Sequence, residues 1–139
     1  MKRILTLAAA ILAVSLYSCG KDDKKNDTPA NPFVGSWTLE SVSNDGIEET
    51  TDCSKKGKIV FTEKSITLNS FYIKPSDNSC NSAKYEFTYT YKEGKVTNVK
   101  NQENGEVVDS FITFTLENDF LVYTQVDEDS KTVIKYTKQ

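Results

Sequence analysis

The chain has 139 residues, with 17 Lys and Arg against 20 Asp and Glu, which gives a net charge of −3 at pH 7. Arg3 is its only arginine, and histidine is absent. Such a chain lacks the basic surface that binds phosphate backbones, so we expect no nucleic-acid partner. Without histidine it also lacks the usual general base and the commonest metal ligand, so we expect no enzyme activity, no metal and no other cofactor.

The N-terminus has the pattern of a targeting segment. Two basic residues precede an apolar run, residues 4–16, which is shorter than the roughly 20 residues that span a bilayer. The run ends in Leu16-Tyr17-Ser18-Cys19, which resembles the lipobox of bacterial lipoproteins. We therefore expect residues 1–18 to be a lipoprotein signal peptide and Cys19 to carry the lipid that anchors the protein to a membrane. The alternative is an ordinary signal peptide in which Cys19 stands at the cut by chance.

Residues 19–32 are predicted to be a disordered tether, because they are rich in charge, contain two prolines and show no apolar periodicity. Lys21-Asp22-Asp23 resembles the export signal of surface lipoproteins in some Gram-negative bacteria. The resemblance implies a lipid-anchored protein of the outer membrane that faces the cell surface, and a periplasm-facing protein is the alternative.

Residues 33–139 are predicted to be one domain. Valine, isoleucine, threonine, tyrosine and phenylalanine alternate with period two between turns of Gly, Asn and Asp, which is typical of strands, and no helical period is evident. The predicted strands are Val34–Ser43, Lys58–Thr62, Ser65–Ile73, Lys84–Lys92, Lys95–Lys100, Val107–Leu116, Phe120–Val126 and Lys131–Thr137.

Eight short strands joined by tight turns favour antiparallel pairing between neighbours in the sequence. Such a meander hides its two edges when it closes on itself. We therefore predict an all-β fold, an eight-stranded antiparallel up-and-down barrel. A two-sheet sandwich is the alternative, although the connections are short for Greek-key crossings.

The domain contains two cysteines, Cys53 and Cys80. In an oxidising envelope an even number of cysteines favours a disulfide, which we predict between these two residues. The alternatives are two free buried thiols or a metal-binding pair. A zinc site without histidine would need carboxylate ligands.

Gly35-Ser36-Trp37 at the start of the domain resembles the Gly-x-Trp signature of lipocalins. The chain is similar to the lipocalin-like lipoproteins of the Bacteroides group, which share a lipobox, an acidic tether, a cysteine before the second strand and a terminal Tyr-x-Lys, here Tyr136-Thr137-Lys138. Lipocalins place an arginine of the last strand over this tryptophan, and here Lys135 or Lys138 stands in. The resemblance implies a lipocalin-like barrel that binds a small apolar or amphiphilic molecule.

Inward-facing aromatic residues are the main chemical resource of such a barrel. If they leave a cavity, an apolar ligand lies among them and tyrosine hydroxyls hold its polar end. The predicted ligand-binding residues are Trp37, Leu39, Tyr85, Phe87, Tyr89 and Tyr123. With no arginine to clamp a carboxylate, we expect a neutral or weakly anionic ligand.

The same side chains are also able to fill a small barrel completely. In that case the domain is a surface interaction module that binds protein or glycan through its loops, with Phe71-Tyr72-Ile73 as the best candidate patch. The acidic turn Asp127-Glu128-Asp129 lacks the ligand spacing of a calcium loop, and we interpret it as a solvated turn.

Overall fold

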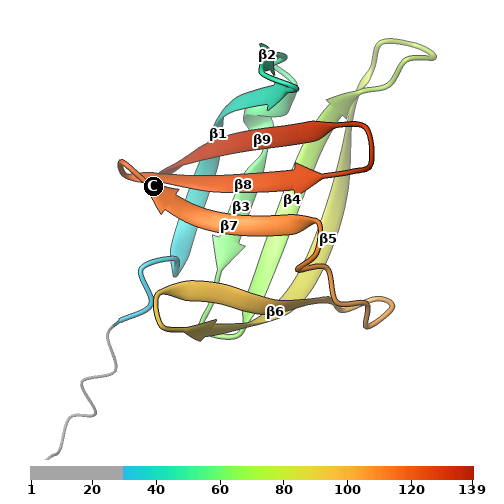
Figure 1. Ribbon diagram of the computed structural model, residues 1–139. Coiled ribbons are helices and arrows are strands. Elements are labelled where there is room, and N and C mark those ends of the chain that lie inside the picture. Colours follow the sequence, from blue (N-terminus) through green and yellow to red (C-terminus); the bar gives the residue numbers. More distant parts are fainter. Residues whose placement is uncertain (1–29) are drawn as a thin grey trace, which may run out of the picture.

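The computed structural model describes residues 30–139, which form one strongly curved antiparallel sheet (Figure 1). No helix in this part of the chain is long and apolar enough to cross a membrane. The predicted signal peptide, Cys19 and nearly all of the predicted tether lie outside the described residues. The elements are β1 (Gly35–Asn44), β2 (Ile47–Glu48), the 3-10 helix η1 (Ser54–Lys56), β3 (Lys58–Phe61), β4 (Ser65–Ile73), β5 (Cys80–Lys92), β6 (Lys95–Asn101), β7 (Ile112–Glu117), β8 (Phe120–Val126) and β9 (Lys131–Lys138).

The long strands form a meander that closes on itself. Their order in the sheet is β6-β5-β4-β3-β1-β9-β8-β7, and β2 pairs with β1 off this path. Because β1 pairs with both β3 and β9, the first and last strands of the domain are joined. The remaining seam lies between β6 and β7, where Lys100 of β6 forms an isolated bridge with Val107. The predicted eight-stranded antiparallel barrel is therefore confirmed, as a nearly closed one, and the sandwich is not formed.

Three hairpins of the sheet, β1–β2, β5–β6 and β7–β8, have two-residue turns. Asp45-Gly46, Glu93-Gly94 and Asn118-Asp119 each place both residues at positive φ. Two successive positive φ values define the type I′ turn, whose twist matches that of paired strands. These turns fix the register of the strands that they join.

The predicted strand Val107–Leu116 was wrong at its start, because β7 begins only at Ile112. The chain turns between these points, where the amides of Phe111 and Ile112 both donate to the carbonyl of Val108. The Asp109 carboxylate accepts bonds from backbone amides of β6, which holds this segment out of a continuous strand. Alternation alone therefore overestimated the length of the strand.

Strand β5 is longer than predicted, since it begins at Cys80 and not at Lys84. Its first residues are small or polar and carry no strand pattern, yet Cys80 to Ala83 pair with Ser70 to Ile73 of β4. Pairing with the longer partner strand therefore extends β5 beyond its apolar pattern. The two-residue strand β2 and the helix η1 were not predicted because neither is long enough to show a period.

One end of the barrel is packed solid with aromatic rings and is called the filled end below. Phe61 lies at its centre, with ring centroids 5.7 Å from Phe33, 5.5 Å from Tyr89 and 5.3 Å from Phe114. The segment before β1 covers this end, because Trp37 Nε1 donates to the Phe33 carbonyl at 2.8 Å. These ring contacts pack that end of the interior, and the cavity described below lies toward the opposite end.

Candidate ligand cavity

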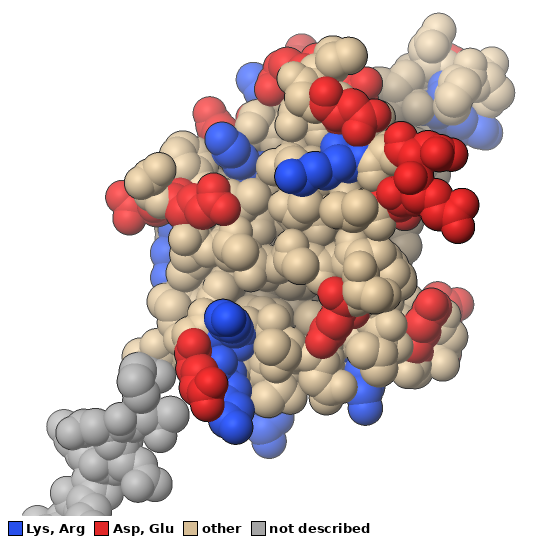
Figure 2. All heavy atoms as spheres, viewed as in Figure 1, with Lys and Arg blue, Asp and Glu red and all other residues tan. Residues whose placement is uncertain are grey.

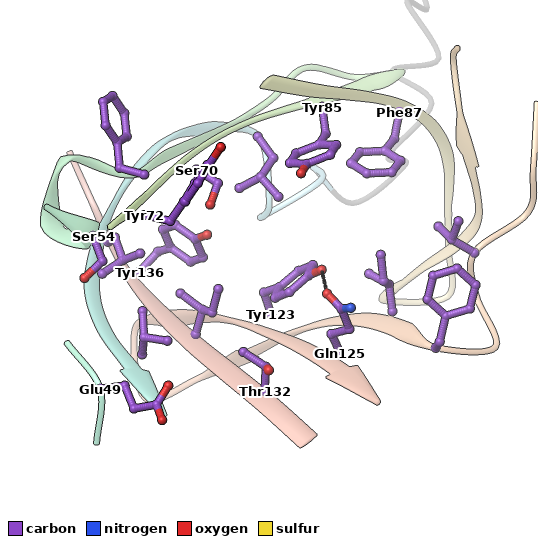
Figure 3. A pocket seen from close by; sticks show the side chains of 18 of the residues that line it. Glu49, Ser54, Ser70, Tyr72, Tyr85, Phe87, Tyr123, Gln125, Thr132 and Tyr136 are labelled. Carbon is purple, nitrogen blue, oxygen red and sulfur yellow. Dashed lines mark hydrogen bonds between the residues drawn. The ribbon is translucent and has the colours of Figure 1, made fainter. Parts of the chain in front are cut away.

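The opposite half of the barrel holds a cavity of about 650 Å³ (Figure 3). It opens where β1, β4, β6 and β8 end, and this opening is called the mouth below. The volume lies within the roughly 300–1,000 Å³ typical of pockets for small molecules. The lining residues are Leu39, Val42, Glu49, Thr51, Ser54, Leu68, Ser70, Phe71, Tyr72, Ile73, Tyr85, Phe87, Asn101, Glu106, Val108, Phe111, Ile112, Tyr123, Gln125, Thr132, Ile134 and Tyr136.

The inner part of the cavity is apolar because alternate residues of several strands point into the barrel. Leu39 of β1, Leu68 of β4 and Phe87 of β5 are buried and belong to the same cluster as the filled end. Ile112 of β7 and Tyr136 of β9 belong to it as well. An apolar chain that enters the mouth would therefore continue the hydrophobic core.

Two tyrosine hydroxyls lie among these apolar side chains. The Tyr123 hydroxyl donates to Gln125 Oε1 at 2.8 Å, and Gln125 Nε2 donates in turn to Asp127 at 3.2 Å (Figure 3). Burial, reinforced by the negative charge of Asp127, raises the pKa of Tyr123, and burial also raises the pKa of Tyr136. Both phenols are therefore neutral hydrogen-bonding groups near pH 7. Tyr136 is 1% exposed, but within residues 30–139 the buried side-chain atom that lacks a hydrogen-bond partner is Thr38 Oγ1 and not the Tyr136 hydroxyl.

The structure separates the predicted ligand-binding residues into two groups. Leu39, Tyr85, Phe87 and Tyr123 line the cavity, and their contact with a ligand stays a prediction. Trp37 and Tyr89 also point inward but lie in the filled end, outside the cavity lining.

The N-terminal segment explains this placement of Tyr89, because its hydroxyl donates to the Thr62 carbonyl at 2.6 Å and accepts from Asn31 Nδ2 at 2.7 Å. Trp37 is covered in the same way by its bond to the Phe33 carbonyl. The two alternatives for the interior, a filled core and a ligand cup, are therefore both present, one at each end of the barrel.

Several lining residues were not predicted. Leu68 and Ser70 follow the alternation of the strand Ser65–Ile73, so the pattern carried a signal for them. Tyr136 was considered only as part of the terminal Tyr-x-Lys motif. Phe111 and Ile112 were assigned to a continuous strand, and their place beside the mouth depends on the turn that precedes β7.

The predicted disulfide is confirmed. Cys53 and Cys80 are bonded, with Cα atoms 5.6 Å apart, and the bond connects the segment that leads into η1 with the first residue of β5. Thr51 and Ser54 on one side of the bond and Ile73 on the other line the cavity, so the disulfide fixes part of the mouth. In residues 30–139 no group of three or more Cys, Asp or Glu side chains is arranged to hold a metal ion.

A nearly closed eight-stranded antiparallel barrel with an interior open at one end is an architecture that holds one small ligand. The sequence matches the family model described as a lipocalin-like domain over residues 33–138. The match covers most of the chain, and the chain belongs to the lipocalin-like domain family. No curated protein matches the sequence significantly.

Proposed function

We propose that this domain binds one small apolar or amphiphilic molecule in the cavity. The cavity is the observation that carries the proposal. Aromatic side chains pack one end of the barrel, and the other end keeps a cavity of about 650 Å³. Apolar area buried by a ligand there contributes roughly 25 cal/mol per Å² before ordering costs are subtracted. Barrel-bound ligands of this class are what the family match supports.

Ligand binding is tested by incubating the purified protein with a lipid extract and recording a native mass spectrum. The expected result is one bound molecule of amphiphile mass. Ser70→Trp is the blocking variant, because Ser70 lines the cavity on β4 and an indole there would occupy it. We expect this variant to bind at least about tenfold more weakly, which corresponds to roughly 1.4 kcal/mol.

Asn69→Trp is the matched control, since Asn69 lies next to Ser70 on the opposite face of β4 and does not line the cavity. This variant should bind as the wild type does. If the wild type binds no amphiphile, the alternative of a surface interaction module is favoured, with Tyr72 and Ile73, 49% and 41% exposed, as its first candidates.

We further propose that the protein is a lipoprotein of the outer membrane, anchored through Cys19 and exposed at the cell surface. The support is the sequence Leu16-Tyr17-Ser18-Cys19 with Lys21-Asp22-Asp23 behind it. The described chain enters the barrel at the filled end, so an N-terminal anchor would join the molecule opposite the mouth. Mass spectrometry of membrane-extracted protein should find diacylglyceryl-Cys19 as the first residue, and Cys19→Ala should leave the precursor uncut. A mature protein with a free Cys19 thiol would contradict this proposal.

A further inference from the structure

The charge of the cavity lining is entirely of one sign. None of the lining residues is lysine or arginine, and two of them, Glu49 and Glu106, are glutamates. Both glutamates are exposed at the mouth, and neither takes part in an ion pair within residues 30–139. A ligand group that reaches the mouth therefore meets carboxylates that have no cationic partner.

The loops around the mouth extend this negative surface. The turn between β8 and β9 carries Asp127, Glu128 and Asp129 in succession. Figure 2 shows acidic atoms gathered at the top of the molecule, near β2, and at the upper right, near the β8–β9 turn. Lys55, Lys56, Lys74 and Lys131 lie in or beside these loops; Lys74 is 3.9 Å from Asp77, and none of the four lines the cavity. Low-dielectric walls concentrate such a field in the opening.

The interior supplies hydrogen-bonding groups but no positive charge. The bonds from Tyr123 to Gln125 and from Gln125 to Asp127 lead outward to a carboxylate, and Asp127 influences the Tyr123 hydroxyl through its charge. The Tyr136 hydroxyl faces the same cavity and, unlike Thr38 Oγ1, is not a buried atom left without a partner in the described chain. A carboxylate head group would thus find no cation to neutralise it, whereas an ammonium group would find acceptors at the mouth.

We infer that the cavity selects cationic amphiphiles over fatty acids, with the apolar chain inside the barrel and an ammonium head group at the mouth beside Glu49 and Glu106. The inference rests on the proposed function, because it names the ligand class of the same cavity. It departs from the expectation from the sequence, in which the absence of arginine indicated a neutral or weakly anionic ligand, because the lining carries two carboxylates and no cation.

The test is calorimetric titration of the purified protein at pH 7 and low salt with three ligands of equal chain length: dodecylamine, dodecanol and dodecanoate. The expected order of affinity is amine, alcohol, carboxylate, with the amine about tenfold tighter than the carboxylate, since each exposed charge contributes little. Added salt should reduce the preference because it screens exposed charges. Dodecanoate binding as tightly as dodecylamine, or more tightly, overturns the inference and leaves the proposed function in place.

Variants identify the carboxylates that select the ligand. The double variant Glu49→Gln/Glu106→Gln should weaken dodecylamine binding about fivefold and leave dodecanol binding unchanged. The matched control Glu63→Gln makes the same change in the β3–β4 turn at the filled end and should alter neither. Unchanged amine affinity in the double variant overturns the inference.

Surface adsorption of an amine by an acidic protein is distinguished with Ser70→Trp. Blocking the cavity should weaken dodecylamine binding at least about tenfold, and an amine affinity that the block leaves unchanged overturns the inference. If none of the three ligands binds the wild type, the proposed function itself fails, and the inference fails with it. One titration series therefore distinguishes failure of the ligand-class inference from failure of the proposed function.

Discussion

The ammonium nitrogen of Lys138 lies 5.1 Å from the centroid of the Trp37 ring, and the two residues are paired between β1 and β9. The same lysine covers Gly35, where a Cβ atom would stand 3.1 Å from Lys138 Cε. The Gly-x-Trp and Tyr-x-Lys motifs thus meet from opposite ends of the domain and close the filled end. Of the two lysines considered for the place of the lipocalin arginine, Lys138 occupies it.

Replacing Lys138 tests the value of this contact. Lys138→Met keeps the apolar stem but removes the charge over Trp37, and it should lower the free energy of unfolding by about 0.5–1 kcal/mol. Lys138→Arg should retain the wild-type value. Lys135→Met, three residues away on the same strand, is the control and should change nothing. Urea unfolding followed by Trp37 fluorescence gives all four values, and equal stability of the Met and Arg variants would show that the contact contributes nothing.

Much of the barrel was predictable because alternation and turn residues act locally. Phe87 and Tyr89 are buried inside the barrel as their spacing in the sequence indicated. The division of the interior was not predictable, because it depends on Phe33, whose ring packs 5.7 Å from Phe61 and 6.0 Å from Tyr91 across the barrel. A residue in front of the first strand shows no period, so no pattern indicated that it would close one end and leave the other hollow.

The disulfide between Cys53 and Cys80 encloses a separation of 27 residues. On the chain-entropy model a loop of this length contributes about 3.5 kcal/mol to stability, by restricting the unfolded chain. The double variant Cys53→Ser/Cys80→Ser should lose about this amount in urea unfolding, and so should reduced wild-type protein. Alkylation of unreduced, unfolded protein should label neither residue. Reduction that leaves the urea midpoint unchanged would contradict the prediction.

Asp109 holds the segment that crosses the seam between β6 and β7. Its two carboxylate oxygens accept the backbone amides of Asn98 at 2.5 Å and Val99 at 2.6 Å. Asn98 has a φ of 52° and lies where the β5–β6 register shifts. The amides of Asn98 and Val99 are therefore not paired with β5 at this bulge.

Asp109→Ala removes both acceptors and should lower the free energy of unfolding by about 1–2 kcal/mol. Amide exchange at Val99 should become faster than in the wild type. Glu103→Ala in the same loop is the control and should leave both quantities unchanged. Wild-type exchange at Val99 in the Asp109 variant would show that water replaces the carboxylate without cost.

Tyr136 makes stability sensitive to alkaline pH. Burial raises the pKa of its hydroxyl in the folded state above the ordinary value of 10.0, so the folded protein keeps this proton when the unfolded chain has released it. The contribution is complete below pH 10 and declines as the pH rises above it, by about 1.4 kcal/mol per pH unit until the folded-state pKa is reached.

Tyr136→Phe removes this titration and no hydrogen bond within residues 30–139. Between pH 8 and pH 11 the variant should therefore lose about 1.4 kcal/mol less than the wild type in urea unfolding. Tyr72→Phe, at a side chain that is 49% exposed, is the control and should follow the wild type. Equal losses in the wild type and Tyr136→Phe would show that the buried hydroxyl ionises as readily in the folded protein as in the unfolded chain.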